Sequence, residues 1–270
     1  MTRLCSLIAV LAWGIAAPGL AQMDGPGSAG VSASLIRLFG TNNAFTAQAE
    51  VQVLGKDNKE RSGTPMTFTL LGNKICVEVD LTRMRDRERP DAVAQMKPLG
   101  LDNVVSMLHP EQRKTIITFP KLRAFVRLDM PPGEAEAFMK HAKIERTPAG
   151  KEKMEGHPCV KQRVVITDDG GKKSEATVWA ATDLRDFPVC VATKELEGTV
   201  VIRFRQIQFT QAEAGKFVPP PGYVECADMQ VLMKGPVVKY MKENHTAVKA
   251  NPKSQQTAPS KSGTVPSKKK

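Results

Sequence analysis

The histidines are the side chains best suited to acid–base or metal chemistry, and their spacing supports neither. They are scattered along the chain and form no HxH or HExxH pattern: His109, His141, His157 and His245. His157 stands two residues before Cys159, but a turn histidine beside a structural cysteine is the preferred interpretation over a cysteine–histidine dyad. Nucleophile-elbow (GxSxG) and P-loop patterns do not occur. We therefore predict no catalytic residue, no metal ligand and no cofactor, and a protein that is not an enzyme.

The N-terminal segment has the features of a secretion signal. Arg3 supplies a positive charge, Leu4–Ala17 is apolar, and small residues precede a cleavage site that we place after Ala21. An uncleaved anchor is the alternative. The mature protein is therefore expected in the periplasm or outside the cell, beginning with a flexible leader at residues 22–30.

The cysteines beyond this segment are compatible with disulfides. Their number is even, and an oxidising compartment favours pairing of Cys76, Cys159, Cys190 and Cys226. Four cysteines allow three connectivities. We favour Cys159–Cys190 because both residues lie on neighbouring predicted strands; buried apolar thiols are the alternative. The lack of CxxC spacing argues against a redox or structural zinc site.

Positive charge is concentrated at the C-terminus. The formal net charge is +11, and Lys249–Lys270 contributes six lysines and no acidic residue. Residues 245–270 are rich in Lys, Ser, Thr and Pro, which predicts a disordered tail. The lysines could contact an anionic envelope surface, or the tail could be an inert solubilising segment. Aromatic residues make up 5% of the chain, and none lies among these lysines, so nucleic acid is not predicted as a partner.

Alternation of apolar and polar residues predicts antiparallel strands along most of the chain. It is strict from Phe45 to Val53, which indicates one buried and one solvated face. The most β-rich stretch, Gly156–Thr193, contains three strands: Cys159–Thr167, Ser174–Ala181 and the one that begins at Val189. Further predicted strands are Thr64–Leu71, Lys74–Leu81, Thr115–Phe119, Leu122–Leu128 and Gly198–Phe209, the last with a bulge near Gln206.

Short helices are predicted between these strands. Helical spacing indicates Val31–Phe39, part of Asp91–Leu108, Gly133–Ile144, and Ala227–Lys242 with an interruption at Gly235-Pro236. In the second, one helical face would carry Leu101, Val104, Val105 and Leu108. Roughly eight to ten antiparallel strands with a few helices predict an α+β fold: a curved antiparallel sheet, or half-barrel, with short helices packed on the concave face.

Several segments together resemble a superfamily of outer-membrane lipoprotein-sorting proteins, the LolA-like proteins. These segments are the strand FTAQAEVQVLG, the GxxC of Gly156 and Cys159, the VWAAxDLxxFPV of Val178–Val189, and the FxPPxGY of Phe217–Tyr223. The resemblance covers about residues 31–230 and is to a poorly characterised branch with a domain of unassigned function. It implies a half-barrel domain at residues 31–244 that is closed by a lid of helices.

The resemblance also implies a function without catalysis. In that superfamily acyl chains occupy the gap between sheet and helices, which implies a lipid or lipoprotein acyl chain as partner; we expect a monomer. Candidate ligand-binding residues are Phe45, Ala47, Val51, Leu122, Val126, Ile202 and Phe204 on strands, Leu101, Val105 and Phe138 on the lid, and Trp179. Ordinary core packing is the competing interpretation of these residues. The alternative function is an envelope-sensing or protein-interaction module with a filled core and no lipid.

Overall fold

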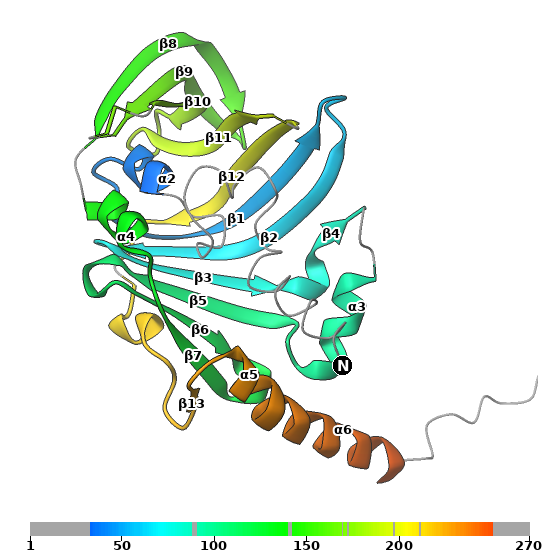
Figure 1. Ribbon diagram of the computed structural model, residues 1–270. Coiled ribbons are helices and arrows are strands. Elements are labelled where there is room, and N and C mark those ends of the chain that lie inside the picture. Colours follow the sequence, from blue (N-terminus) through cyan, green and yellow to red (C-terminus); the bar gives the residue numbers. More distant parts are fainter. Residues whose placement is uncertain are drawn as a thin grey trace, which may run out of the picture.

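The computed structural model describes residues 33–250, except 88–90, 140–141, 169, 172, 197 and 211 (Figure 1). The predicted secretion signal, the leader and the part of the tail after Ala250 lie outside the described residues. None of the helices in the described part of the chain is long and apolar enough to cross a membrane.

The described strands form one open, curved sheet of 13 strands (Figure 1). Its order is β13-β7-β6-β5-β3-β2-β1-β12-β11-β10-β9-β8, and β4 pairs only with β2. Neighbouring strands are antiparallel, except that β13 is parallel to β7. The strands are β1 (Ala44–Gly55), β2 (Glu60–Leu71), β3 (Lys74–Asp80), β4 (Arg85–Asp86), β5 (Asn103–His109), β6 (Lys114–Phe119), β7 (Ala124–Asp129), β8 (Lys143–Met154), β9 (His157–Thr167), β10 (Lys173–Ala181), β11 (Phe187–Glu195), β12 (Gly198–Gln208) and β13 (Val224–Cys226).

Short helices accompany the sheet at both ends of its curve. Figure 1 shows α2 inside the curve beside β11 and β12, and α5 continuing into α6 near the ends of β6 and β7. The helices are α2 (Ala33–Leu38), η2 (Leu81–Arg83), α3 (Ala92–Met96), η3 (Lys97–Leu99), η4 (Pro110–Gln112), η5 (Pro120–Leu122), α4 (Pro132–Met139), η6 (Ala214–Phe217), α5 (Met229–Leu232), the π-helical η7 (Met233–Val237) and α6 (Val238–Ala250). The predicted α+β class, with a curved antiparallel sheet and short helices on its concave face, is confirmed.

Strand β1 shows why the pattern-based predictions succeeded. Phe45, Ala47 and Ala49 are buried, and the polar residues between them face the other side of the sheet. The predicted bulge near Gln206 is also confirmed. Gln206 has a φ of 51°, and the pairing of β12 with β1 shifts register between Gln208 and Arg205. The extra residue in β12 explains the change of phase in its sequence.

The predicted helical face after Gly100 is wrong. The helix and its 3₁₀ continuation end at Leu99, and Gly100 terminates them with a φ of 71°. The following residues form β5, so Val104 faces the concave side whereas Val105 packs on the opposite side. Positions separated by four share a face in a helix and also in a strand, so the spacing alone did not distinguish the two.

A second prediction, the helix Gly133–Ile144, is wrong at its C-terminal end, where strand β8 begins. The predicted helix Gly133–Ile144 ends at Met139 as α4, and Ile144 belongs to β8. Ten of the twelve residues of β8 are exposed, so its sequence has no apolar alternation that would predict a strand. Two boundaries also differ: Leu122 lies in η5 instead of a strand, and α6 continues to Ala250, beyond the predicted start of the tail.

Candidate functional site

Most predicted ligand-binding residues meet on the concave side of the sheet. Six of them belong to one buried apolar cluster: Phe45, Ala47, Leu101, Val126, Ile202 and Phe204. Three others pack against this cluster and are half-buried: Val51, Leu122 and Phe138. Val105 does not join them, because it packs on the outer side against a smaller cluster that includes Phe217. Trp179 is half-buried at the edge of the main cluster and donates its indole N–H to Glu152 at 2.6 Å.

Phenylalanines fill the concave side where α2 lies. Five rings have centroids 4.8–5.9 Å apart, and none of them is more than 2% exposed: Phe39, Phe45, Phe68, Phe187 and Phe204. Phe39 directly follows α2 and therefore fixes this helix to the sheet. Tilted and edge-to-face rings of this kind are favourable core packing. Phe45 and Phe204, predicted as ligand contacts, are thus core residues in the structure.

Methionines border the cluster at its other end, where η2, α3 and α5–α6 lie. Met96 is buried in the cluster, and four half-buried methionines pack against it: Met84, Met229, Met233 and Met241. Methionine side chains are flexible and polarisable, and they adapt to irregular apolar partners. We call α5, η7 and α6 the lid; it is anchored by the buried Leu232 and Val237.

The lid has a break in its middle and a close contact beyond it. Asp228 caps its start by accepting a hydrogen bond from the Val231 N–H at 2.8 Å. The predicted interruption at Gly235-Pro236 is confirmed as the π-helical η7, a geometry that often marks functional positions. After the break Tyr240 lies over Gly100: a Cβ added to Gly100 would come within 3.0 Å of its ring.

A buried carboxylate lies close to the same contact. Asp102 is 1% exposed, and one of its oxygens accepts a hydrogen bond from Lys121 at 2.6 Å. This hydrogen bond raises the pKa of Lys121. The pair fixes η5 relative to the start of β5, and so it positions Leu122 beneath α6.

The cysteines and histidines give no sign of a reactive centre. Cys159 and Cys190 are free, and β10 lies between their strands, so the expected disulfide between neighbouring strands is not formed. Burial raises the pKa of both thiols, that of Cys190 to about 11. His157 pairs with Asp183 at 2.9 Å, which supports its interpretation as a turn residue. Within the described residues, no group of three or more histidine, cysteine or acidic side chains is placed to hold a metal ion.

A ladder of ion pairs crosses the outer face of the sheet. Glu155, at the tip of the β8–β9 hairpin, accepts hydrogen bonds from Arg205 at 2.5 Å and Arg203 at 3.1 Å. Arg205 also pairs with Glu50, which pairs with Arg85. Burial alone would raise the pKa of Glu50 and Glu155, but their arginine partners outweigh it and lower both. The ladder fixes the hairpin tip to β12.

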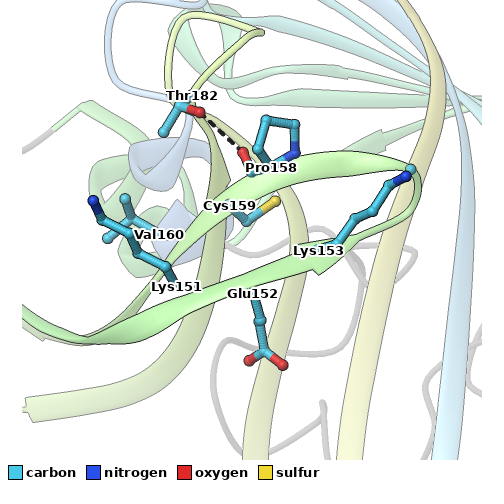
Figure 2. A pocket seen from close by; sticks show the side chains of 8 residues that line it. Lys151, Glu152, Lys153, Pro158, Cys159, Val160 and Thr182 are labelled. Atoms are coloured by element: carbon cyan, nitrogen blue, oxygen red, sulfur yellow. Dashed lines mark hydrogen bonds between the residues drawn. The ribbon is translucent and has the colours of Figure 1, made fainter.

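The β8–β9 hairpin also borders a cavity that the sequence did not reveal. Figure 2 shows side chains from both strands of the hairpin around it, with Thr182 from the turn after β10. Its volume is about 700 Å³, and its lining is Lys151, Glu152, Lys153, Gly156, Pro158, Cys159, Val160 and Thr182. The cavity lacked a sequence signal because β8 itself was not predicted.

Comparison with known proteins finds likeness only at the level of structure. No family model matches the chain, and no curated protein matches it at a significant level. Solved structures do match. A LolA superfamily protein from Nitrosomonas europaea is 9% identical over 70% of this chain and 98% of its own, with a TM-score of 0.35. LprF from Mycobacterium bovis is 12% identical over 71% of this chain and 96% of its own, with a TM-score of 0.37.

The third is a putative outer-membrane lipoprotein-sorting protein domain from Vibrio parahaemolyticus. It is 11% identical over 68% of this chain and 94% of its own, with a TM-score of 0.32. The chain is similar to these three structures. These are likenesses of fold alone.

Proposed function

We propose that the protein is a non-enzymatic binding protein of the periplasm or cell surface that holds a lipid or another apolar ligand. The ligand would lie between the concave side of the sheet and the lid. Non-directional apolar contact is the chemistry that this side of the sheet offers, and it suits an acyl chain, which has no polar group to recognise.

The observation that carries this proposal is the methionine-bordered lid. Met229, Met233 and Met241 are half-buried against the apolar cluster. An apolar ligand could therefore replace part of their contacts while the cluster stays shielded from water. The π-helical break at Gly235-Pro236 gives the lid a place to bend. We place the ligand at this end of the sheet because phenylalanines fill the end beside α2.

Mass spectrometry under native conditions tests the proposal directly. Protein purified without detergent should carry acyl-containing species, and the delipidated protein should take up a fluorescent fatty acid. Met233→Gln should weaken this uptake about fivefold, because it removes about 1 kcal/mol of apolar contact. Met139→Gln is the matched control, since Met139 is 44% exposed on α4. A ligand-free mass combined with no uptake would contradict lipid binding.

The phenylalanine cluster favours a second candidate function. A concave side filled by Phe39, Phe68 and Phe187 suits an envelope-sensing or protein-interaction module that binds its partner on an outer surface. In that case Met233→Gln and Met139→Gln would behave alike in every uptake assay, and the purified protein would be free of lipid.

A further inference from the structure

The cavity at the β8–β9 hairpin is separate from the lid and has the size of a small-molecule site. Its volume of about 700 Å³ lies within the range of typical ligand pockets. Pro158, Cys159 and Val160 supply apolar surface from β9, and Lys151 and Lys153 supply charge from β8 (Figure 2). The lining thus combines an apolar surface with ammonium groups.

The two lysines differ from the other lysines of the hairpin in having no carboxylate partner. Lys143 pairs with Glu145 at 2.5 Å, and Lys161 pairs with Glu152 at 3.1 Å. Among the described residues no acidic side chain pairs with Lys151 or Lys153. Lys151 and Lys153 are two positions apart, so they leave β8 on the same face, with their Cα atoms about 7 Å apart along the strand. Figure 2 shows their side chains extending toward opposite ends of the hairpin.

The only carboxylate of the lining is already occupied. Glu152 accepts hydrogen bonds from the Trp179 indole at 2.6 Å and pairs with Lys161 at 3.1 Å. Lys161 also lies 5.0 Å from the centre of the Trp179 ring. Because Lys161 balances Glu152, the charge of Lys151 and Lys153 remains uncompensated, and the cavity has a net charge of about +2.

The hairpin that presents the lysines is held in place from two sides. Glu155 at its tip binds Arg203 and Arg205 of β12. At the start of β9, the Pro158 carbonyl accepts a hydrogen bond from the Thr182 hydroxyl at 3.1 Å. The backbone of the site therefore loses little conformational entropy when a ligand binds, and the ordering cost falls on the two lysine side chains.

We propose that this cavity binds a small amphiphile with a phosphate group. The phosphate would lie on this face of β8, and the exposed Lys151 and Lys153 side chains would turn toward it from either side. Their two charges match a phosphate monoester near neutral pH. The apolar part would lie against Pro158 and Val160. Neither a phosphate-free apolar molecule nor inorganic phosphate alone uses both halves of the lining.

Calorimetric titration with short-chain compounds below their micelle concentration tests the site. The compounds are dihexanoyl phosphatidic acid, dihexanoylglycerol without the phosphate, glycerol 3-phosphate and inorganic phosphate. We expect the phosphatidic acid to bind most tightly. Lys151→Gln combined with Lys153→Gln should weaken its binding at least tenfold, and the Lys→Arg pair should restore most of it. Both lysines are exposed, so the thermal melt should not change.

Two further variants identify the site and separate it from the lid. Lys173→Gln combined with Lys194→Gln removes two exposed charges elsewhere on β10 and β11 and should leave the affinity unchanged. Met233→Gln should also leave it unchanged, so this site and the proposed lid function can fail independently. Equal weakening in the Lys173/Lys194 variant would overturn the proposal, since general surface charge would explain binding. Inorganic phosphate binding as tightly as the phosphatidic acid would also overturn it and assign the lysines to free phosphate.

Discussion

At the scale of single residues, Gly100 is the position at which the lid meets the sheet. It has a φ of 71°, and a Cβ there would lie 2.8 Å from Leu122 and 3.0 Å from the Tyr240 ring. Glycine therefore serves two purposes, a left-handed backbone and the close approach of α6.

Replacing Gly100 should destabilise the fold through both effects. In Gly100→Ala, the left-handed backbone conformation of the alanine should lower the unfolding free energy by about 1 kcal/mol. The steric clash of its Cβ should lower it by about 1–3 kcal/mol more. Gly72→Ala is a control that isolates the backbone part, because Gly72 has a φ of 59° and open space around it. Urea unfolding of both variants measures the difference. Equal losses of unfolding free energy would show that α6 does not pack on Gly100.

The candidate site was only partly predictable at this scale. Phe45, Ala47 and Val126 could be identified from strand alternation, because burial follows period two along a strand. Their role as core could not be distinguished from ligand contact. The cavity lysines could not be found, since their lack of a partner depends on how distant acids such as Glu145 and Glu152 are already paired.

At the scale of elements, the β8–β9 hairpin is fixed at its tip by one side chain. Glu155 is the only acid that the structure shows bound to both Arg203 and Arg205, and its side chain is 13% exposed. Because the pair is partly buried, it is worth more than a surface ion pair.

Substituting Glu155 should loosen the hairpin. Glu155→Gln should lower the unfolding free energy by about 1–2 kcal/mol and speed hydrogen exchange of the β8 and β9 amides. Glu145→Gln, which breaks an exposed pair with Lys143, should cost at most about 0.5 kcal/mol.

The sign of the pH dependence checks the same contact. The pKa of Glu155 is lowered in the folded protein, so its contribution to stability is present above the unfolded value near 4.5. That contribution is lost as the pH falls through the folded pKa. The wild type should therefore lose more stability than Glu155→Gln on acidification, and an identical pH profile in both proteins would contradict the role given to Glu155.

Elements were predictable where one face is buried and the other solvated. Such strands, β1 and β12 among them, carry an alternating pattern. Strand β8 is an edge strand with both faces largely exposed, so packing imposes no pattern on it. Strand β5 was mistaken for a helix because Leu101, Val105 and Leu108 stand at helical spacing, and positions four residues apart share a face in a strand as well.

At the scale of the whole molecule, the net positive charge suggests contact with an anionic surface. The C-terminal lysines supply the largest group of positive charges in the sequence. We propose that the tail, residues 251–270, strengthens binding to anionic membranes without contributing to the folded body.

Removing the tail tests this division. A chain ending at Ala250 should bind vesicles of phosphatidylglycerol about tenfold or more weakly than the full chain at low salt, because each lysine near a surface contributes about 1 kcal/mol or less. Its melting temperature should be unchanged. The difference should disappear at high salt, where the charges are screened. Unchanged vesicle binding would identify the tail as an inert segment.

The strand order has a consequence for how the chain reaches its native state. Strands β1–β3 and β5–β7 pair mostly with their neighbours in sequence, and so do β8–β12. The exception is the pairing of β1 with β12, where the bonded residues Glu50 and Arg205 are 155 residues apart. Closing so long a loop is entropically costly, and pairings of high sequence separation form slowly. Two meanders should therefore assemble independently, and the seam between β1 and β12 should form last. Until that seam forms, β1 and β12 each offer an edge of unpaired backbone N–H and C=O groups. A chain in this state is the folding intermediate most prone to associate with another copy.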